Sequence, residues 1–303
     1  MSSRLKAYLA LGTMAVIWGA ALPIVKPSLN FISPYQFLYL RYLIATPLLL
    51  PVLVYYLLKL RPSLKIIVKI AVLEFFEIVV SLPILYQGLK LTSALEASLI
   101  GGAGPVFVVL GGIVFLHERE EKREWQGLAL SFLGTVILVV EPFLTGRNNH
   151  LGFSFLGNLL ILAHNLTYVI YVLTAKVWYR SLPKILISAI SYPVAFTGFI
   201  LILYFSGQSF SPQLLTIPAV ALAAGYMAVF GSIVAWTLFL YGQNLIEASE
   251  ASLFSYLQGI VAVPVAWLFL NETVSPLMIL AIIIVALGVY LAERHPKRYN
   301  HNS

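Results

Sequence analysis

Hydrophobic and polar positions follow a simple pattern along the chain, in which long apolar runs are separated by short polar connections. Each run is long enough, as a helix, to cross the roughly 30 Å hydrocarbon layer of a membrane. The runs lack the strict apolar and polar alternation of β-barrel strands. The pattern therefore predicts an all-α membrane protein with ten transmembrane helices and no separate soluble domain. The predicted spans are residues 6–26, 34–58, 65–89, 93–117, 124–143, 152–175, 184–206, 214–241, 248–270 and 275–293.

An internal repeat organises these spans. The stretch from Ala94 to Glu118 has a second copy from Ala248 to Glu272, which follows 154 residues later without a gap. In the first copy, the residues that recur identically are Ala94, Glu96, Ala97, Ser98, Leu99, Val109, Phe115, Leu116 and Glu118. The register continues from Gly134 to Gly288. A repeat at about half the chain length indicates duplication. We therefore predict two related halves, residues 1–146 and 147–303, with the functional site where they meet.

The distribution of Lys and Arg predicts an orientation, because these residues collect in cytoplasmic connections. With the amino terminus in the cytoplasm, fifteen lie inside and three outside. The inside set is Arg4, Lys6, Lys59, Arg61, Lys65, Lys69, Arg119, Lys122, Arg123, Lys176, Arg180, Lys184, Arg294, Lys297 and Arg298; the outside set is Lys26, Lys90 and Arg147. Arg41 alone falls inside a span. The bias predicts a multi-pass protein of the plasma membrane with both termini cytoplasmic.

This orientation makes the repeat an inverted one. The two copies lie in the fourth and ninth predicted spans, which are five crossings apart, so they run in opposite directions through the bilayer. The predicted fold is an inverted 5+5 structural repeat, which can open to either side when its halves exchange conformations. Glu118 and Glu272 end the two copies on opposite sides of the membrane. We expect them to cap helix ends or to latch connections as the halves move.

The orientation can be tested by labelling, because the natural chain contains no cysteine. Single cysteines introduced at Ser63 and Ser303 are expected to react with a membrane-impermeant thiol reagent only from the cytoplasmic side. A cysteine at Ser211 is expected to react only from the outside. Any other pattern in oriented vesicles contradicts the predicted topology.

Composition narrows the range of functions. The chain is 60% hydrophobic and 10% charged, whereas a soluble domain carries about 25% charged residues. Because cysteine is absent, thiol chemistry, disulfides and cysteine-based zinc or iron–sulfur sites are excluded. No HExxH or paired-histidine spacing is present, so we predict neither a metal site nor a cofactor. The net charge of +7 reflects membrane topology rather than nucleic-acid binding.

Several short motifs, in this order and spacing, resemble a known family. They are WGAALPIVK, SPYQFLYLR, LKLTSALEASL, FLHE, ASEASL and FLNE. Together they resemble the EamA-type members of the drug/metabolite transporter superfamily over nearly the whole chain. The resemblance implies secondary transport without ATP, often export of amino acids or other small metabolites, and a central cavity lined by spans 1, 3, 4, 6, 8 and 9. Pro105 matches the family's usual proline in span 4, but Gly259 stands at the corresponding position of span 9, with Pro264 five residues later.

Two acids in the third predicted span are the first candidates for chemistry. Glu74 and Glu77 lie three residues apart on one helix face. A charged side chain near the bilayer centre costs about 2.5 to 3.5 kcal/mol on insertion scales. Two neighbouring carboxylates resist being ionised together, so one of them is a candidate proton carrier. The alternative is that both are neutralised and only join helices.

Other candidate substrate-binding residues lie near the middle of predicted spans. His164 and Asn165 are polar residues in the sixth span, where hydrogen-bonded packing is the alternative role. The aromatic candidates are Trp18, Phe76, Tyr168, Tyr226 and Tyr256, because a ring with a polar atom deep in a membrane is better placed against a cavity. Gly101 precedes Gly102, Gly104 and Pro105, which interrupt regular hydrogen bonding in span 4 and favour a hinge or a cavity wall. We expect Trp18, His164 and Tyr256 to face one cavity.

These features favour a secondary transporter of small metabolites, such as amino acids or similar amphipathic solutes, working by alternating access as an exporter. No Walker motif is present to indicate an ATP-driven pump. Two alternatives remain at this point: an intramembrane lipid-modifying enzyme and a proton-coupled multidrug exporter. The expected partners are a small-molecule substrate and the lipid bilayer, with no nucleic acid, and the protein is either a monomer or a homodimer.

Overall fold

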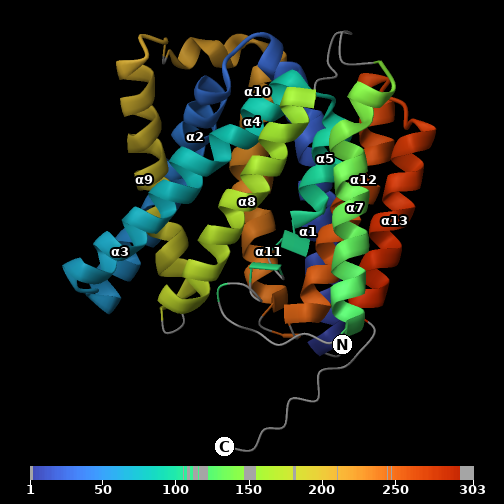
Figure 1. The fold of residues 1–303 in the computed structure, drawn as a ribbon. Helices are drawn as coiled ribbons and strands as arrows, with labels where there is room; N and C mark the ends of the chain where they lie inside the picture. The colour runs from blue at the N-terminus through green and yellow to red at the C-terminus, as the bar shows by residue number, and fades with distance from the viewer. Residues whose placement is uncertain are drawn as a thin grey trace, which may run out of the picture.

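The structure, a computed structural model, is a bundle of helices (Figure 1). It describes residues 3–104, 106–107, 110–111, 115, 122–146, 155–179, 182–209, 211–243, 245–246 and 248–293. Within these residues the regular structure is entirely helical. The prediction of an all-α protein is confirmed.

Several of the helices join end to end. The first half of the chain contains α1 (Ser3–Val25), the 3-10 helix η1 (Lys26–Asn30), α2 (Pro34–Leu60), α3 (Leu64–Glu74), the π-helix η2 (Phe75–Ser81), α4 (Leu82–Leu91), α5 (Ala94–Gly102) and α7 (Lys122–Leu144). The second half contains α8 (Phe155–Trp178), α9 (Lys184–Phe205), the 3-10 helix η4 (Pro212–Thr216), α10 (Pro218–Tyr226), the π-helix η5 (Met227–Val234), α11 (Ala235–Gln243), α12 (Ala248–Leu270) and α13 (Pro276–Glu293). Two long helices, α3–η2–α4 and α10–η5–α11, therefore each contain a π-helical segment.

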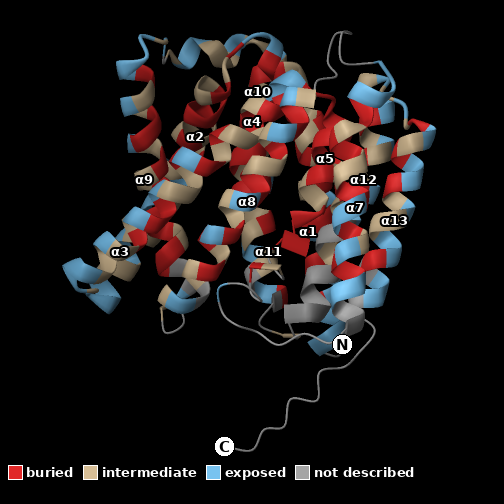
Figure 2. Ribbon diagram, in the orientation of Figure 1, coloured by how far each residue is buried: buried red, intermediate tan, exposed pale blue. Residues whose placement is uncertain are grey.

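Within the described residues, six helices are long and apolar enough to cross a membrane. They are Ser3–Asn30, Pro34–Leu60, Trp125–Leu144, Phe155–Ala175, Leu186–Phe205 and Pro218–Phe239, and the shorter apolar helices are Leu257–Leu270 and Pro276–Gly288. Figure 2 shows exposed residues on the outward faces of helices such as α3 and α13, and buried residues between helices. Many exposed side chains are large and apolar, as a lipid-facing surface requires. The count of ten spans stays a prediction.

Local sequence explains where the helices begin and end. Ser33 starts α2 with a capping box, because its side chain accepts from the N–H of Gln36 while the Gln36 side chain accepts from the N–H of Ser33. Ser93 caps α5 by accepting from the N–H of Glu96. Arg61 ends α2 in the left-handed conformation, with φ of 42°.

Glycines allow several helices to approach closely. A Cβ atom on Gly88 would lie 2.7 Å from the carbonyl oxygen of Gly157, and one on Gly157 would lie 2.9 Å from the carbonyl oxygen of Gly88. Real Cβ contacts are longer than this, so α4 and α8 need glycine at both positions. Gly134 lies in the same way against Val285 and the carbonyl oxygen of Ala281, which brings α7 against α13. Small residues at helix interfaces are the usual means of close packing in membranes.

Candidate functional site

The two π-helices place polar residues at the middle of the bundle. A π-helix adds a residue to a helical turn and is frequent at functional sites. The π-helix η2 lies between α3 and α4, and η5 lies between α10 and α11. Both pack against helices of the other half, η2 against α9 and α8, and η5 against α1 and α2.

Glu74, at the end of α3, has its carboxylate fully engaged. One oxygen accepts from the hydroxyls of Tyr171 at 3.0 Å and Tyr179 at 2.9 Å, and the other accepts from the hydroxyl of Ser191 at 2.7 Å. The side chain is buried. These bonds tie α3 to α8 and α9, so the geometry matches an acid that joins helices.

Glu77, one turn later in η2, has a different environment. Its Oε2 atom is buried and has no hydrogen-bond partner within the described part of the chain. Its carboxyl group lies close to Ser81, four residues later in η2. The Ser81 hydroxyl also lies 3.1 Å from Nδ1 of His164 and 2.7 Å from the hydroxyl of Thr167. Glu77, Ser81 and His164 therefore lie close together between η2 and α8, and we call this polar group the acid cluster.

Other predicted residues surround the acid cluster. The ring of Tyr168 lies 6.1 Å from the ring of His164, centroid to centroid, and Phe76 packs in the same apolar cluster as Tyr168. Asn165 donates to the carbonyl oxygen of Ile100 at 2.8 Å, which ties α8 to α5. Next to this bond, a Cβ atom on Gly101 would meet open space. The structure thus brings Phe76, Glu77, His164 and Tyr168 together.

Trp18 and Tyr226 form a second group. The indole N–H of Trp18 donates to the carbonyl oxygen of Gly231 at 2.9 Å, and its ring contacts Trp236 and Phe239. The hydroxyl of Tyr226 donates to the carbonyl oxygen of Ile17 at 2.7 Å. Both bonds join α1 to the helix that contains η5. The side chain of Tyr256 lies outside the described residues, so a shared cavity for Trp18, His164 and Tyr256 stays a prediction.

Glu272 follows α12 and caps a helix of the other half. Its carboxylate oxygens accept from the backbone N–H groups of Ala94 at 2.9 Å and Leu95 at 2.8 Å, at the start of α5. Burial raises the pKa of the Glu272 carboxyl, and these N–H groups together with Lys26 act in the opposite direction. The expected capping role is confirmed for Glu272. Glu118 lies outside the described residues.

Several polar residues of this region were not among the predicted site residues. Glu96 in α5 and Glu141 in α7 are both buried and close enough to interact, and Ser275 donates to Glu141 at 2.6 Å. Arg41, on α2, donates to the hydroxyl of Ser232 at 2.9 Å. A charged residue inside a predicted span was the available signal for Arg41, whereas the partner of each acid depends on tertiary packing.

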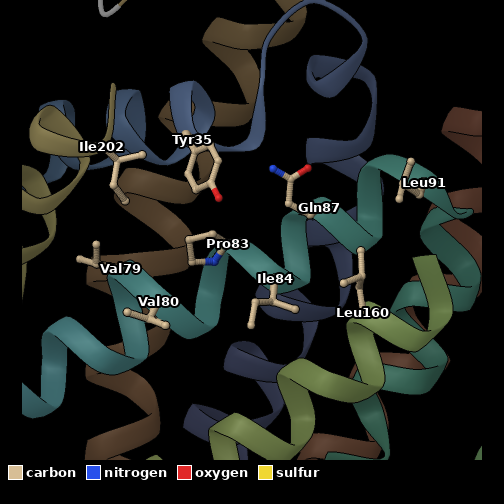
Figure 3. A pocket seen from close by; sticks show the side chains of 9 residues that line it. All are labelled: Tyr35, Val79, Val80, Pro83, Ile84, Gln87, Leu91, Leu160 and Ile202. Atoms are coloured by element: carbon tan, nitrogen blue, oxygen red, sulfur yellow. The ribbon is translucent and has the colours of Figure 1, made fainter. Parts of the chain in front are cut away.

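A cavity lies beside η2. It has a volume of about 480 Å³ and is lined by Tyr35, Val79, Val80, Pro83, Ile84, Gln87, Leu91, Leu160 and Ile202 (Figure 3). Its lining is largely apolar. None of the predicted substrate-binding residues contributes to it.

Comparison with known proteins agrees with the fold and the motifs. The chain matches the EamA-like transporter family over residues 5–140 and 155–293. It is 25% identical to an uncharacterized transporter of Archaeoglobus fulgidus, over 96% of this chain and 99% of that protein. It is 24% identical to the uncharacterized transporter YetK of Bacillus subtilis, over 99% and 91%, and 23% identical to the uncharacterized inner membrane transporter YedA of Escherichia coli, over 95% and 92%.

A solved protein crystal structure shares the fold, with a TM-score of 0.62 and 17% identity over 95% of this chain and 96% of the other. The family match covers most of both halves of the chain. Together with the apolar helices, it makes this a multi-pass membrane protein. The chain belongs to the EamA-like transporter family.

Proposed function

We propose that this protein is a secondary transporter that exports small amphipathic metabolites, such as amino acids, by alternating access between two inverted halves of five helices. No ATP is required. The halves are residues 1–146 and 147–303, and both termini lie on the cytoplasmic side of the plasma membrane. The observation that carries the proposal is a contact between α7 and α13 that occurs twice, with the roles of the halves exchanged.

The two contacts involve equivalent residues. Gly134 packs against Val285 and the carbonyl oxygen of Ala281, whereas Gly288 packs against Ser131 and the carbonyl oxygen of Gly127. Adding the repeat offset of 154 to residues 127, 131 and 134 gives residues 281, 285 and 288. The two contacts therefore involve corresponding residues of the two halves. A two-fold axis between similar halves produces this relation. The offset also places the range of η2 over residues 229–235, which overlaps η5 (Met227–Val234).

The helix caps made by Glu272 and, by the repeat, Glu118 are consistent with two alternating states. Here Glu272 holds the start of α5, so one end of the bundle is tied across the two halves. The repeat relates Ala94 to Ala248 and Glu272 to Glu118. In the opposite state, Glu118 takes the same role at the start of α12 on the other side of the membrane. Exchange of the two caps opens one side as it closes the other.

The acid cluster favours one alternative function, proton-coupled multidrug export. The unpaired, buried carboxyl oxygen of Glu77 suits a group that takes up and releases a proton. The lipid-modifying enzyme is less well supported. Nδ1 of His164 lies 3.2 Å from the carbonyl oxygen of Ser81 as well as near the Ser81 hydroxyl. If Nδ1 donates to that carbonyl, it cannot also accept the proton of the Ser81 hydroxyl. A serine nucleophile activated by a histidine base would require that acceptance.

A flux measurement tests the proposal. Purified protein in proteoliposomes is screened with amino acids, nucleosides and cationic drugs, with and without a pH gradient. We expect saturable flux of at least one amphipathic solute class, absent from protein-free liposomes. Lipid turnover without solute flux would instead identify an enzyme, and uptake limited to cationic drugs under a pH gradient would identify the multidrug exporter.

A further inference from the structure

Arg41 is a charged side chain inside the bundle whose partners are neutral. Its Nε donates to the hydroxyl of Ser232 at 2.9 Å, and its Nη1 lies 3.5 Å from the hydroxyl of Tyr86. The guanidinium carbon lies 5.2 Å from the ring centre of Tyr42. None of these contacts is a carboxylate, although a buried cation normally has one. The site therefore holds a positive charge without an opposite charge.

Among the described residues, no acid forms an ion pair with Arg41. Glu74 accepts from Tyr171, Tyr179 and Ser191, and Glu272 accepts from the start of α5. Glu77 lies close to Ser81 on the η2 side of the acid cluster. Within the described part of the chain, no acid supplies the counter-charge for Arg41.

Arg41 also retains unused donors. A guanidinium carries five N–H groups, and its contacts here use Nε and, at long distance, Nη1. The side chain is partly exposed, and none of its nitrogens is both buried and unpaired. An N–H group of Arg41 without a partner among the described residues is therefore not fully buried, and a bound solute could accept from it.

The surroundings of Arg41 come from both halves of the chain. Arg41 and Tyr86 lie on α2 and α4, whereas Ser232 lies in η5. Ser232 is also next to Gly231, whose carbonyl oxygen accepts from Trp18. A cationic group and an apolar aromatic group thus bind neighbouring residues of the same π-helix. A ligand that spans them contacts both halves, so its binding depends on how the halves are arranged.

We propose that Arg41 binds the carboxylate of the transported solute, with the apolar part of that solute against Trp18. This rests on the proposed transport function and narrows its substrates to small apolar or aromatic carboxylates, amino acids included. A guanidinium binds a carboxylate through two parallel hydrogen bonds. A single cation is neutralised by one carboxylate, whereas a phosphate carries more negative charge than Arg41 can balance. The neutral hydroxyls of Tyr86 and Ser232 add no charge of their own.

Binding to purified full-length protein tests this without any transport. The probes are 3-phenylpropanoate and its neutral amide, 3-phenylpropanamide, together with inorganic phosphate. We expect 3-phenylpropanoate to raise the thermal unfolding midpoint in a concentration-dependent way, because it binds only the folded protein. The amide at the same concentration should leave the midpoint unchanged. Equal stabilisation by acid and amide, or no stabilisation by either, overturns the proposal.

Substitutions test whether Arg41 is responsible for the stabilisation by 3-phenylpropanoate. Arg41→Gln should lose the response to 3-phenylpropanoate, and Arg41→Lys should bind it about 10- to 100-fold more weakly because the two parallel bonds are lost. Arg61→Gln removes an exposed positive charge and serves as the control, with an unchanged response. A wild-type response in Arg41→Gln contradicts the proposal. If Arg41→Gln does not fold, the response of Arg41→Lys and the acid–amide comparison on the natural protein still test the proposal.

Three further outcomes distinguish a phosphate site, a failure of the transport function and a failure of the carboxylate site. Stabilisation by inorganic phosphate that disappears in Arg41→Lys would assign the site to phosphate and overturn the carboxylate. Arg41-dependent binding of 3-phenylpropanoate without flux in proteoliposomes would contradict transport and leave the site in place. Flux of neutral solutes with no acid preference would contradict the site and leave transport in place.

Discussion

In a proton-driven transporter, replacing Glu77 by Gln is expected to abolish uphill transport while leaving exchange of substrate down its own gradient. Glutamine keeps the size of the side chain but cannot take up or release a proton. Glu77 has a buried oxygen without a partner in the described part of the chain, and it lies close to Ser81, whose hydroxyl contacts His164. A proton held in this cluster can pass to either side as the halves move. The expected effect is complete loss of concentrative uptake in response to a pH gradient.

The measurement compares the two transport modes in the same proteoliposomes, with uptake driven by a pH gradient in one and counterflow in the other. Glu74→Gln is the matched control, because three hydroxyls already donate to Glu74 and tie it into the bundle. That variant should lower thermal stability and leave the coupling intact. If Glu77→Gln still concentrates substrate when a pH gradient is applied, Glu77 is a structural acid.

The second large effect concerns the cap at the start of α5. Glu272→Ala removes both acceptors from the N–H groups of Ala94 and Leu95. Hydrogen bonds to a charged group are worth about 1.5 to 3 kcal/mol, so the closed state of this end should become about 10- to 100-fold less favoured. Acidification acts in the same direction, because protonation removes an acceptor. Since burial raises the pKa of Glu272, this should begin at a less acidic pH than for an ordinary glutamate.

Thiol accessibility measures this shift. A cysteine at Ser98, which is buried one turn into α5, should react faster with an impermeant reagent when Glu272 is replaced by Ala. Glu272→Gln retains one acceptor oxygen and should give an intermediate rate. Reaction rates that match those of the natural protein in both variants mean that the cap does not hold this end closed.

Much of the bundle follows from local sequence. Apolar runs set the helices, and Ser33 and Ser93 mark the starts of α2 and α5 through caps that need only neighbouring residues. The π-helices could not be predicted in this way, because the apolar pattern of residues 75–81 suits an ordinary helix as well. Both π-helices pack against helices of the other half, and these contacts cannot be read from neighbouring residues.

The candidate site was predictable only in part. Glu77 and His164 stood out as polar residues inside apolar spans, and in the structure both lie close to Ser81, a residue common in any helix. The different environments of Glu74 and Glu77 depend on Tyr179 and Ser191, which are far away in sequence. The carbonyl oxygen that accepts from Trp18 belongs to Gly231, and no side-chain pattern reveals a backbone acceptor.

Alternating access between the halves is the central claim, and a reversible cross-link tests it most directly. Cysteines at Leu91 and Thr273, both exposed at the end of the bundle that Glu272 ties, are joined by a short, reducible bifunctional thiol reagent. A pair at Leu58 and Leu64, both exposed and within the first half, is the control. We predict that the Leu91–Thr273 cross-link stops flux in proteoliposomes, that reduction restores it, and that the control pair has no effect. Undiminished flux through the fully cross-linked Leu91–Thr273 protein would contradict the account.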